Sequence, residues 1–235
     1  VTLMRGLEGT QVRLVVAPGL QDVVPGRMRA LTVTQGWTGL IAVKTRRTRA
    51  AGKALFDRVA GAVGLALISP LLAATAIAIR IDSPGPVFYT QTRVGQNGKP
   101  FTMWKFRSMY TDSDARRASV VKSGGDAGNE VMFKDRQDPR ITHVGRWIRR
   151  LSIDELPQLI NVVRGDMSLV GPRPALPVEV AKYDAEALRR LLVKPGLTGL
   201  WQISGRSDLS WASTVALDRH YVENRGGALD AKIFA

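Results

Sequence analysis

An uncharged run of 21 residues, 59–79, restricts most strongly what this chain can fold into. As a helix, this run is long enough to cross the hydrocarbon core of a bilayer. Pro70 lies near its middle and follows Ser69, whose hydroxyl can bond a backbone group that a proline kink leaves free. The run therefore predicts a membrane helix with a kink at Ser69-Pro70.

Basic residues flank the run on both sides, with Lys53 and Arg58 before it and Arg80 after it. Cationic flanks favour the cytoplasmic side of a membrane, so charge at both ends predicts a re-entrant helix that enters and leaves by one face. A straight membrane span remains the main competing interpretation, and a buried core helix is a third.

The charge of the whole chain points to anionic partners. Lys and Arg number 34 against 20 acidic residues, which gives a formal net charge of +14. Such a balance suits nucleic acid, anionic lipids or phosphorylated substrates. The chain has no cysteine and only two histidines, His143 and His220, which excludes disulfides and disfavours a zinc enzyme. Residues 1–30 have no apolar core of the length that a signal peptide requires.

Residues 1–50 look like a fragment of a domain followed by a linker. Residues 12–16 have the composition of a buried strand, and residues 31–33 are a second candidate. A basic linker follows, made of Lys44, Arg46, Arg47 and Arg49. We therefore divide the chain into residues 1–50 and a main domain over residues 51–235.

A β-hairpin is predicted directly after the apolar run. Residues 87–94 and 100–109 flank Asn97-Gly98, a dipeptide typical of a type I′ turn. The hairpin carries four polar side chains, Gln91, Arg93, Lys105 and Arg107. They either contact a substrate or form a solvated basic face.

Residues 112–130 are polar and rich in glycine, which is typical of a flexible excursion that could act as a lid. Residues 144–150 follow, with Trp147 and Ile148 beside three arginines. This segment fits an interfacial helix on anionic headgroups, and it fits a basic helix against the core equally well.

Adjacent carboxylates, Asp154 and Glu155, precede Pro157, a residue that fits the first turn of a helix. We expect the helix to begin near Asp154 and to end at Gly165, with a stripe of apolar residues formed by Leu156, Leu159, Ile160 and Val163. A helix N-terminus favours charged carboxylates and can bind phosphate. The alternative is that both carboxylates only cap the helix.

A short strand is expected over residues 166–170, before Gly171-Pro172-Arg173-Pro174. The two prolines stiffen the backbone around Arg173, whose guanidinium suits bidentate capture of a phosphate. Further on, residues 177–193 have helical spacing and Ser207 is a candidate cap for a last helix. Between them, residues 194–206 combine glycines with Lys194 and Arg206, a pattern that can gather backbone N–H groups around an anion.

The run SIDELPQL-N-RGDMSLVGPRP, together with KFRSM at residues 105–109 and the glycine-rich stretch at 194–206, resembles the signature of the bacterial sugar transferases. These are monotopic polyprenyl-phosphate phosphoglycosyl transferases, and the resemblance covers roughly residues 53–230. It weakens at residues 224–227, where family members usually continue with Asn-Trp-Ser and a long apolar helix, so we expect a shortened C-terminus. Longer members carry an accessory Rossmann-like domain, whose end residues 1–50 resemble.

The resemblance implies transfer of a sugar 1-phosphate from a UDP-sugar to polyprenyl (undecaprenyl) phosphate, which initiates exopolysaccharide, capsule or O-antigen synthesis. Asp154 would be the nucleophile that forms an aspartyl-phosphosugar, and Glu155 would hold Mg²⁺. Ser69 and Pro70 would place the reaction at headgroup depth. The residues predicted to bind phosphate or substrate are Lys105, Arg107, Arg173, Lys194, Gly196, Thr198, Arg206 and Asp218.

The implied fold is an α/β (α+β) membrane-associated catalytic domain with a re-entrant helix that is broken at Ser69-Pro70, a β-hairpin and amphipathic interfacial helices. It would lie on the cytoplasmic side of the inner membrane, against anionic lipids. One rival is a non-catalytic basic protein that binds nucleic acid or membrane, but no helix-turn-helix, zinc knuckle or aromatic RNA motif is evident, so we expect no nucleic acid partner. A truncated, inactive family relative is the other alternative.

Overall fold

A computed structural model describes residues 28–31, 40–43, 49–113, 138–205 and 209–234. The chain divides into two compact units, Val1–Arg47 and Thr48–Ala235. In the first, β1 (Met28–Leu31) pairs with β2 (Leu40–Val43) as an antiparallel hairpin. The strand predicted at residues 12–16 lies outside the described residues, as does most of the basic linker. The likeness of this unit to the end of a Rossmann-like domain stays a prediction.

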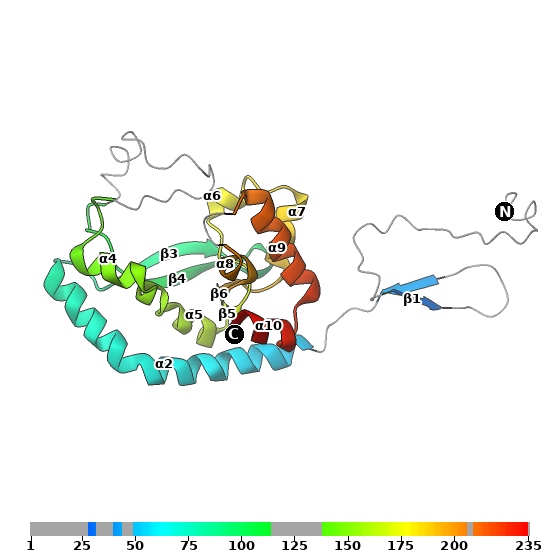
Figure 1. Ribbon diagram of the computed structural model, residues 1–235, viewed down its shortest axis with the longest axis horizontal. Coiled ribbons are helices and arrows are strands. Elements are labelled where there is room, and N and C mark those ends of the chain that lie inside the picture. Colours follow the sequence, from blue (N-terminus) through cyan, green and yellow to red (C-terminus); the bar gives the residue numbers. More distant parts are fainter. Residues whose placement is uncertain (1–27, 32–39, 44–48, 114–137, 206–208, 235) are drawn as a thin grey trace, which may run out of the picture. The chain divides into compact units, whose positions relative to one another are not determined.

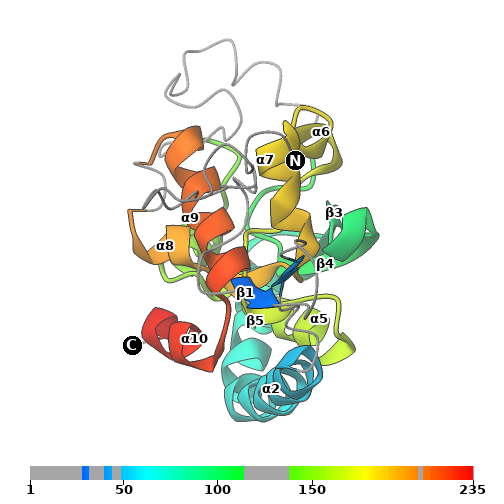
Figure 2. The same ribbon diagram turned by 90° about the vertical axis from the view of Figure 1, so that its right-hand side faces the viewer.

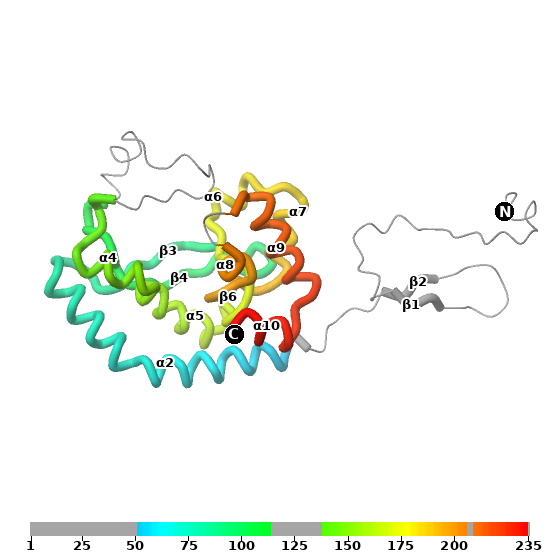
Figure 3. The backbone as a smooth tube through the Cα atoms, viewed as in Figure 1, coloured from blue at the N-terminus to red at the C-terminus, as the bar shows by residue number. Residues whose placement is uncertain are grey.

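Helix α2 (Arg49–Asp82) contains the whole apolar run and continues through Pro70. The helix bends near its middle and is not broken there (Figures 1 and 3). Pro70 has no N–H to donate to the carbonyl of Ala66, and the Ser69 hydroxyl donates to that same carbonyl at 2.8 Å. The predicted break is therefore a bend, because the serine supplies the hydrogen bond that the proline cannot make.

The predicted hairpin is confirmed. Strand β3 (Phe88–Val94) pairs antiparallel with β4 (Pro100–Phe106), and the turn between them contains the 3₁₀ segment η2 (Gln96–Gly98). Asn97 and Gly98 both have positive φ, at 58° and 77°, and the Lys99 N–H donates to the carbonyl of Gln96 at 3.3 Å. These are the features of a type I′ turn.

The central stretch begins with α4 (His143–Arg150), continues through the 3₁₀ turn η3 (Ile153–Glu155), and reaches α5 (Gln158–Arg164) and β5 (Ser168–Val170). Gly165 ends α5 with φ 90°, as predicted. The start near Asp154 is wrong, because the α-helix begins only at Gln158. Pro157 cannot donate to the carbonyl of Ile153, which instead accepts the Leu156 N–H at 3.1 Å and closes a tighter 3₁₀ turn.

The helix predicted at residues 177–193 is three short pieces: α6 (Pro177–Val180), α7 (Ala185–Leu188) and the 3₁₀ turn η4 (Arg189–Leu192). Asp184 interrupts it, because its backbone is extended and its carboxylate caps α7 by accepting the Ala187 N–H at 2.8 Å.

Strand β6 (Gly196–Thr198) then pairs parallel with β5. Three helices complete the unit: α8 (Leu200–Ile203), α9 (Trp211–Asn224) and α10 (Gly227–Phe234). The cap of α9 is Ser210, not Ser207, which lies outside the described residues; the Ser210 hydroxyl accepts the Ser213 N–H at 3.2 Å.

The second unit is a mixed helical domain with small sheets, which agrees with the α+β part of the fold prediction. Helix α2 lies along one side of it, with α5 and α10 beside its N-terminal half (Figures 1 and 2). Gly61 lets α2 and α5 approach closely, since a Cβ added at Gly61 would lie 3.1 Å from Val162 of α5. Val162 is fully buried with Met103 and Met167, so α5 joins the hairpin to α2.

Most of α2 is not covered by the rest of the unit. Only 11% of its most apolar stretch is buried. By length and composition, the helix could cross a membrane. Large apolar side chains are exposed along it: Leu55, Phe56, Val59, Val63, Leu67, Leu71, Ile77 and Ile81. Such a surface is unusual for a core helix, which disfavours that interpretation of residues 59–79.

Candidate active site

The two predicted catalytic carboxylates lie on the 3₁₀ turn η3, next to the hairpin. The turn begins after Ser152, which has a left-handed backbone with φ 57°. Lys105, from β4, bonds Glu155 with 2.7 Å between Nζ and Oε1. The fold thus brings together two predicted site residues that are 50 positions apart in the chain.

Burial is the main influence on the pKa of Asp154, and it raises that pKa. The positive charge of Lys105 partly opposes the rise, and the negative charge of Glu155 adds to it. This is the opposite of the expectation that a helix dipole would favour the charged form. The dipole expectation failed because Asp154 precedes the α-helix and is half-buried beside another carboxylate.

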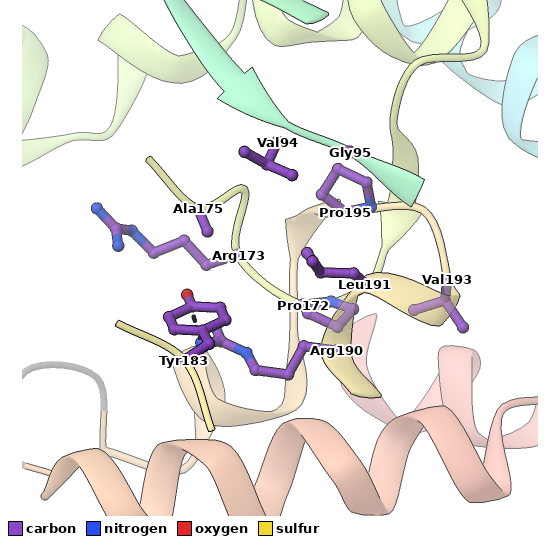
Figure 4. A pocket seen from close by; sticks show the side chains of 10 residues that line it. All are labelled: Val94, Gly95, Pro172, Arg173, Ala175, Tyr183, Arg190, Leu191, Val193 and Pro195. Atoms are coloured by element: carbon purple, nitrogen blue, oxygen red, sulfur yellow. Dashed lines mark hydrogen bonds between the residues drawn. The ribbon is translucent and has the colours of Figure 1, made fainter. Parts of the chain in front are cut away.

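Arg173 lies on the loop that follows β5, and its guanidinium is half-buried. Its Nη1 lies 3.3 Å from Oε1 of Glu179, while the other carboxylate oxygen of Glu179 accepts the Leu176 N–H at 2.7 Å. Arg173 therefore pairs with Glu179, not with either carboxylate of η3. Figure 4 shows its side chain extending away from Pro172 and above the ring of Tyr183.

A small cavity lies behind this loop. Its volume is about 10 Å³, which is close to the space that one water needs, so it is too small for a sugar or a nucleotide. The residues around it are Val94, Gly95, Pro172, Arg173, Ala175, Tyr183, Arg190, Leu191, Val193 and Pro195 (Figure 4).

Asp218 forms a buried ion pair with Arg190. The carboxylate belongs to α9, is only 1% exposed, and lies 2.7 Å from the Arg190 guanidinium. That guanidinium lies over the rings of Tyr183 and Trp211, which also contact each other, and it donates to the Tyr183 hydroxyl at 3.0 Å. Burial raises the pKa of Asp218 to about 6, even though Arg190 opposes the rise. These contacts hold α9 against η4, and the predicted contact of Asp218 with substrate stays a prediction.

Arg107 is also buried, at 5% exposed, and its guanidinium faces the end of α2. It donates to the carbonyls of Ser83 and Pro84 at 2.7 and 2.6 Å and to the Ser83 hydroxyl at 3.0 Å. Burial lowers its pKa, and the neighbouring Arg80 adds to the effect. These bonds fasten the exit of α2 to β4, which is a structural task that the sequence did not indicate.

The glycine-rich stretch also supports the fold. The Gly196 N–H donates to the carbonyl of Pro172 at 2.8 Å, and the carbonyl of Thr198 accepts the Gly171 N–H at 2.9 Å. An added Cβ at Gly196 would collide with the backbone of Gly171, so only glycine fits. The Gly196 N–H and the Thr198 carbonyl are therefore occupied by bonds to the loop that follows β5, and the predicted binding of substrate by Gly196 and Thr198 stays a prediction.

Burial lowers the pKa of Lys194, and its electrostatic neighbours are Arg58, Asp57 and Asp166. None of these belongs to η3. Arg206 lies outside the described residues, so its role stays a prediction.

Asn161 is a residue whose importance the sequence did not reveal. Its side chain is completely buried; it accepts the Trp104 N–H at 3.1 Å and donates to the carbonyl of Thr102 at 2.7 Å. Its backbone carbonyl accepts N–H groups from three residues, Gly165, Asp166 and Met167. It therefore fixes α5 to β4, and so η3 to Lys105. A polar residue inside an apolar stripe was the available signal.

The exposed face of α4 carries Trp147, which is 65% exposed, and Arg146, Arg149 and Arg150 around it. Ile148 points the other way and is 5% exposed. The helix thus has an apolar anchor on the core and an aromatic and basic surface outside.

Within the described ranges, no group of three or more histidine or acidic side chains could hold a metal ion. A carboxylate pair beside a lysine, in a unit that also has a long exposed apolar helix, suits a transferase that acts on phosphorylated substrates. Residues 48–235 match the bacterial sugar transferases, and the chain belongs to this family.

Curated relatives agree with this assignment. The chain is 45% identical over 174 residues to the exopolysaccharide production protein ExoY of Rhizobium meliloti, covering 73% of this chain and 77% of that protein. It is 44% identical over 174 residues to an undecaprenyl-phosphate galactose phosphotransferase of Salmonella typhimurium, covering 73% of this chain and 36% of the relative. It is 45% identical over 194 residues to an undecaprenyl-phosphate glucose phosphotransferase of Komagataeibacter xylinus, covering 77% of this chain and 34% of the relative. The chain thus spans about a third of the two longer relatives.

Proposed function

We propose that this chain transfers a sugar 1-phosphate from a UDP-sugar to undecaprenyl phosphate, as the first step of exopolysaccharide or capsule synthesis. Membership of the bacterial sugar transferase family supports the reaction class. The observation that carries the proposal is the pair Asp154-Glu155 on a 3₁₀ turn, with Lys105 bound to Glu155 at 2.7 Å.

Asp154 is the nucleophile in this proposal. Its carboxylate oxygen attacks the β-phosphorus of the UDP-sugar, a P–O bond forms, and the bond to the bridging oxygen breaks to release UMP. A phosphate oxygen of undecaprenyl phosphate then attacks the same phosphorus and restores the carboxylate. A partly buried carboxylate with a raised pKa is poorly hydrated when ionised, which favours its attack.

Glu155 would bind Mg²⁺ in this proposal. Mg²⁺ is commonly held by one or two carboxylates and completed by substrate phosphates and waters, so a cluster of three acidic side chains is not required. One oxygen of Glu155 bonds Lys105, which leaves the other for a cation. The ion would neutralise charge on the diphosphate, while Lys105 and Arg173 supply fixed positive charges from the protein.

The exposed surface of α2 supports a location at the inner membrane, with the catalytic unit on the cytoplasmic side. The bend of α2, the basic residues at both its ends and the Trp147 surface of α4 suit a re-entrant helix lying among anionic lipids.

A direct test measures UMP release from UDP-sugars by the detergent-solubilised protein, with undecaprenyl phosphate present or absent. Asp154→Asn is expected to abolish release and to yield no covalent phosphosugar adduct by mass spectrometry, because an amide cannot attack phosphorus. Asp184→Asn is the matched control, since asparagine caps α7 as well as aspartate does. Normal turnover by Asp154→Asn would remove Asp154 as the nucleophile. No UMP release by the native chain with any UDP-sugar would instead favour an inactive relative.

A further inference from the structure

Arg93, on strand β3, is buried and therefore does not belong to a solvated basic face, and the proposed chemistry gives it no role. Its residue is 7% exposed. Its Nη1 donates to the carbonyl of Pro174 at 2.9 Å, directly after Arg173, and its Nη2 donates to the side chain of Gln91 at 2.6 Å. Its Nε is buried and has no hydrogen-bond partner among the described residues.

The same end of β3 holds the Arg173 loop at a second point. The Val94 N–H donates to the carbonyl of Ala175 at 2.9 Å, and these two residues form an isolated antiparallel bridge. The backbone on the C-terminal side of Arg173 is thus fixed by two consecutive residues of β3. The two prolines beside Arg173 further limit the directions in which its side chain can point.

Arg93 also keeps a positive charge close to Arg173. Burial, and after it the charge of Arg173, lower the pKa of Arg93 to about 10, so Arg93 remains protonated at neutral pH. Glu179 and Glu155 oppose this effect. Glu179 pairs with Arg173 and is also near Arg93, so one carboxylate faces two guanidiniums. The remaining positive charge favours the binding of an anion.

We infer that Arg93 is a positioning residue: it holds the Arg173 loop by its bond to Pro174 so that the Arg173 guanidinium meets a phosphate of the nucleotide sugar. Both donating Nη groups of Arg93 are engaged within the protein, so it acts through Arg173 and does not contact the substrate. The inference rests on the proposed function. It adds to that function a link from the hairpin that carries Lys105 to the loop that carries Arg173.

The test is a double-mutant cycle with Arg93→Lys and Arg173→Lys. A lysine at position 93 keeps the charge but lacks the planar fork whose two Nη groups separately reach Pro174 and Gln91, so the support of the loop is weakened. Each single variant is expected to lower kcat/KM for UMP release by about 10- to 100-fold, the range that follows from misplacing a group in an active site. The double variant should lose little more than the worse single variant, because both changes remove the same interaction.

Arg164→Lys, an exposed arginine at the end of α5, is the matched control and should leave kcat/KM and the melting temperature unchanged. Losses that multiply in the double variant would show that Arg93 acts independently of Arg173 and would overturn the inference. So would an Arg93→Lys enzyme with native kcat/KM, or one that loses only thermal stability.

Calorimetric titration with UDP separates this inference from the proposed function, because it needs no turnover. Both single variants should bind UDP more weakly than the native chain, and the double variant should bind it about as weakly as either. If the native chain releases no UMP but this binding pattern appears, the positioning role stands and the proposed function fails. If UMP is released and the binding losses are independent, the inference alone fails.

Discussion

Asp218 is a residue whose ionisation the fold controls directly. Its pKa is about 6 in the folded chain, against an ordinary value of 3.8, because burial raises the pKa more than Arg190 lowers it. Between pH 4 and pH 6 the folded state therefore keeps a proton that the unfolded chain has released. The free energy of unfolding must fall as pH rises through this window, and it should not change further on account of this residue above about pH 6.

Asp218→Asn should remove that dependence. Through this residue, the free energy of unfolding of the native chain is expected to fall by at most about 3 kcal/mol between pH 4 and pH 7. For the asparagine variant, the free energy of unfolding should depend correspondingly less on pH. Denaturant unfolding at a series of pH values measures both. Asp184→Asn changes an exposed cap and serves as the control. Parallel profiles for the native chain and Asp218→Asn would show that this carboxyl titrates normally.

At the scale of the element, α2 raises the question of how a long apolar helix meets a bilayer. Its bend depends on Pro70, and the carbonyl that Pro70 leaves free is bonded by Ser69. Pro70→Leu would restore an uninterrupted hydrogen-bond ladder and favour a straight span. Ala73→Leu adds an apolar side chain nearby without removing the proline, and it is the control.

Single-cysteine labelling of intact cells tests this prediction, since the chain has no cysteine of its own. One cysteine is placed at Gly52, which has open space around it, and one at Lys99 on the exposed hairpin turn. Ser83 is unsuitable because it is buried against Arg107. Neither site should react with an impermeant reagent in the native background, and one should react with Pro70→Leu. Labelling of only one site in the native chain would establish an ordinary span.

At the scale of the whole unit, the C-terminal helix α10 is tied to the start of α2. Lys53 bonds Asp230 at 2.8 Å, and the buried Tyr221 hydroxyl lies 2.9 Å from the same carboxylate and 2.8 Å from the carbonyl of Val170, so that its one hydrogen can be donated to either acceptor. Ile233 packs in the same core cluster as Val170 and Tyr221. The divergent C-terminal segment is therefore integrated into the domain, which the weakened resemblance at residues 224–227 did not predict.

This link should contribute to stability. Asp230→Asn keeps an acceptor for Tyr221 but removes the charge partner of Lys53, and we expect it to lower the free energy of unfolding by about 1 kcal/mol. The exposed pair of Arg219 and Glu186 is the comparison, and Glu186→Gln should cost less than about 0.5 kcal/mol. Denaturant unfolding measures both values. Equal, negligible losses would mean that α10 is held by its apolar contacts alone.

Several parts of the fold were predictable because local chemistry decides them. Asn97-Gly98 specifies a tight turn between two strands, Gly165 ends a helix, and Ser69 can serve the carbonyl that Pro70 frees. Each of these depends on groups only a few residues apart. The predicted helix over residues 177–193 failed for a related reason, because the capping preference of Asp184 outweighed the apolar spacing.

The sequence by itself determined the family, the apolar helix, the hairpin and the carboxylate pair, because these follow from composition and from contacts within a few positions of the chain. Only the tertiary structure decided which charged residues meet. Arg107 and Asp218 make buried internal contacts, whereas Lys105 meets Glu155 and Arg93 bonds the Arg173 loop. A charge acquires its role from the partner and the burial that distant segments provide, and neither is encoded in its neighbours along the chain.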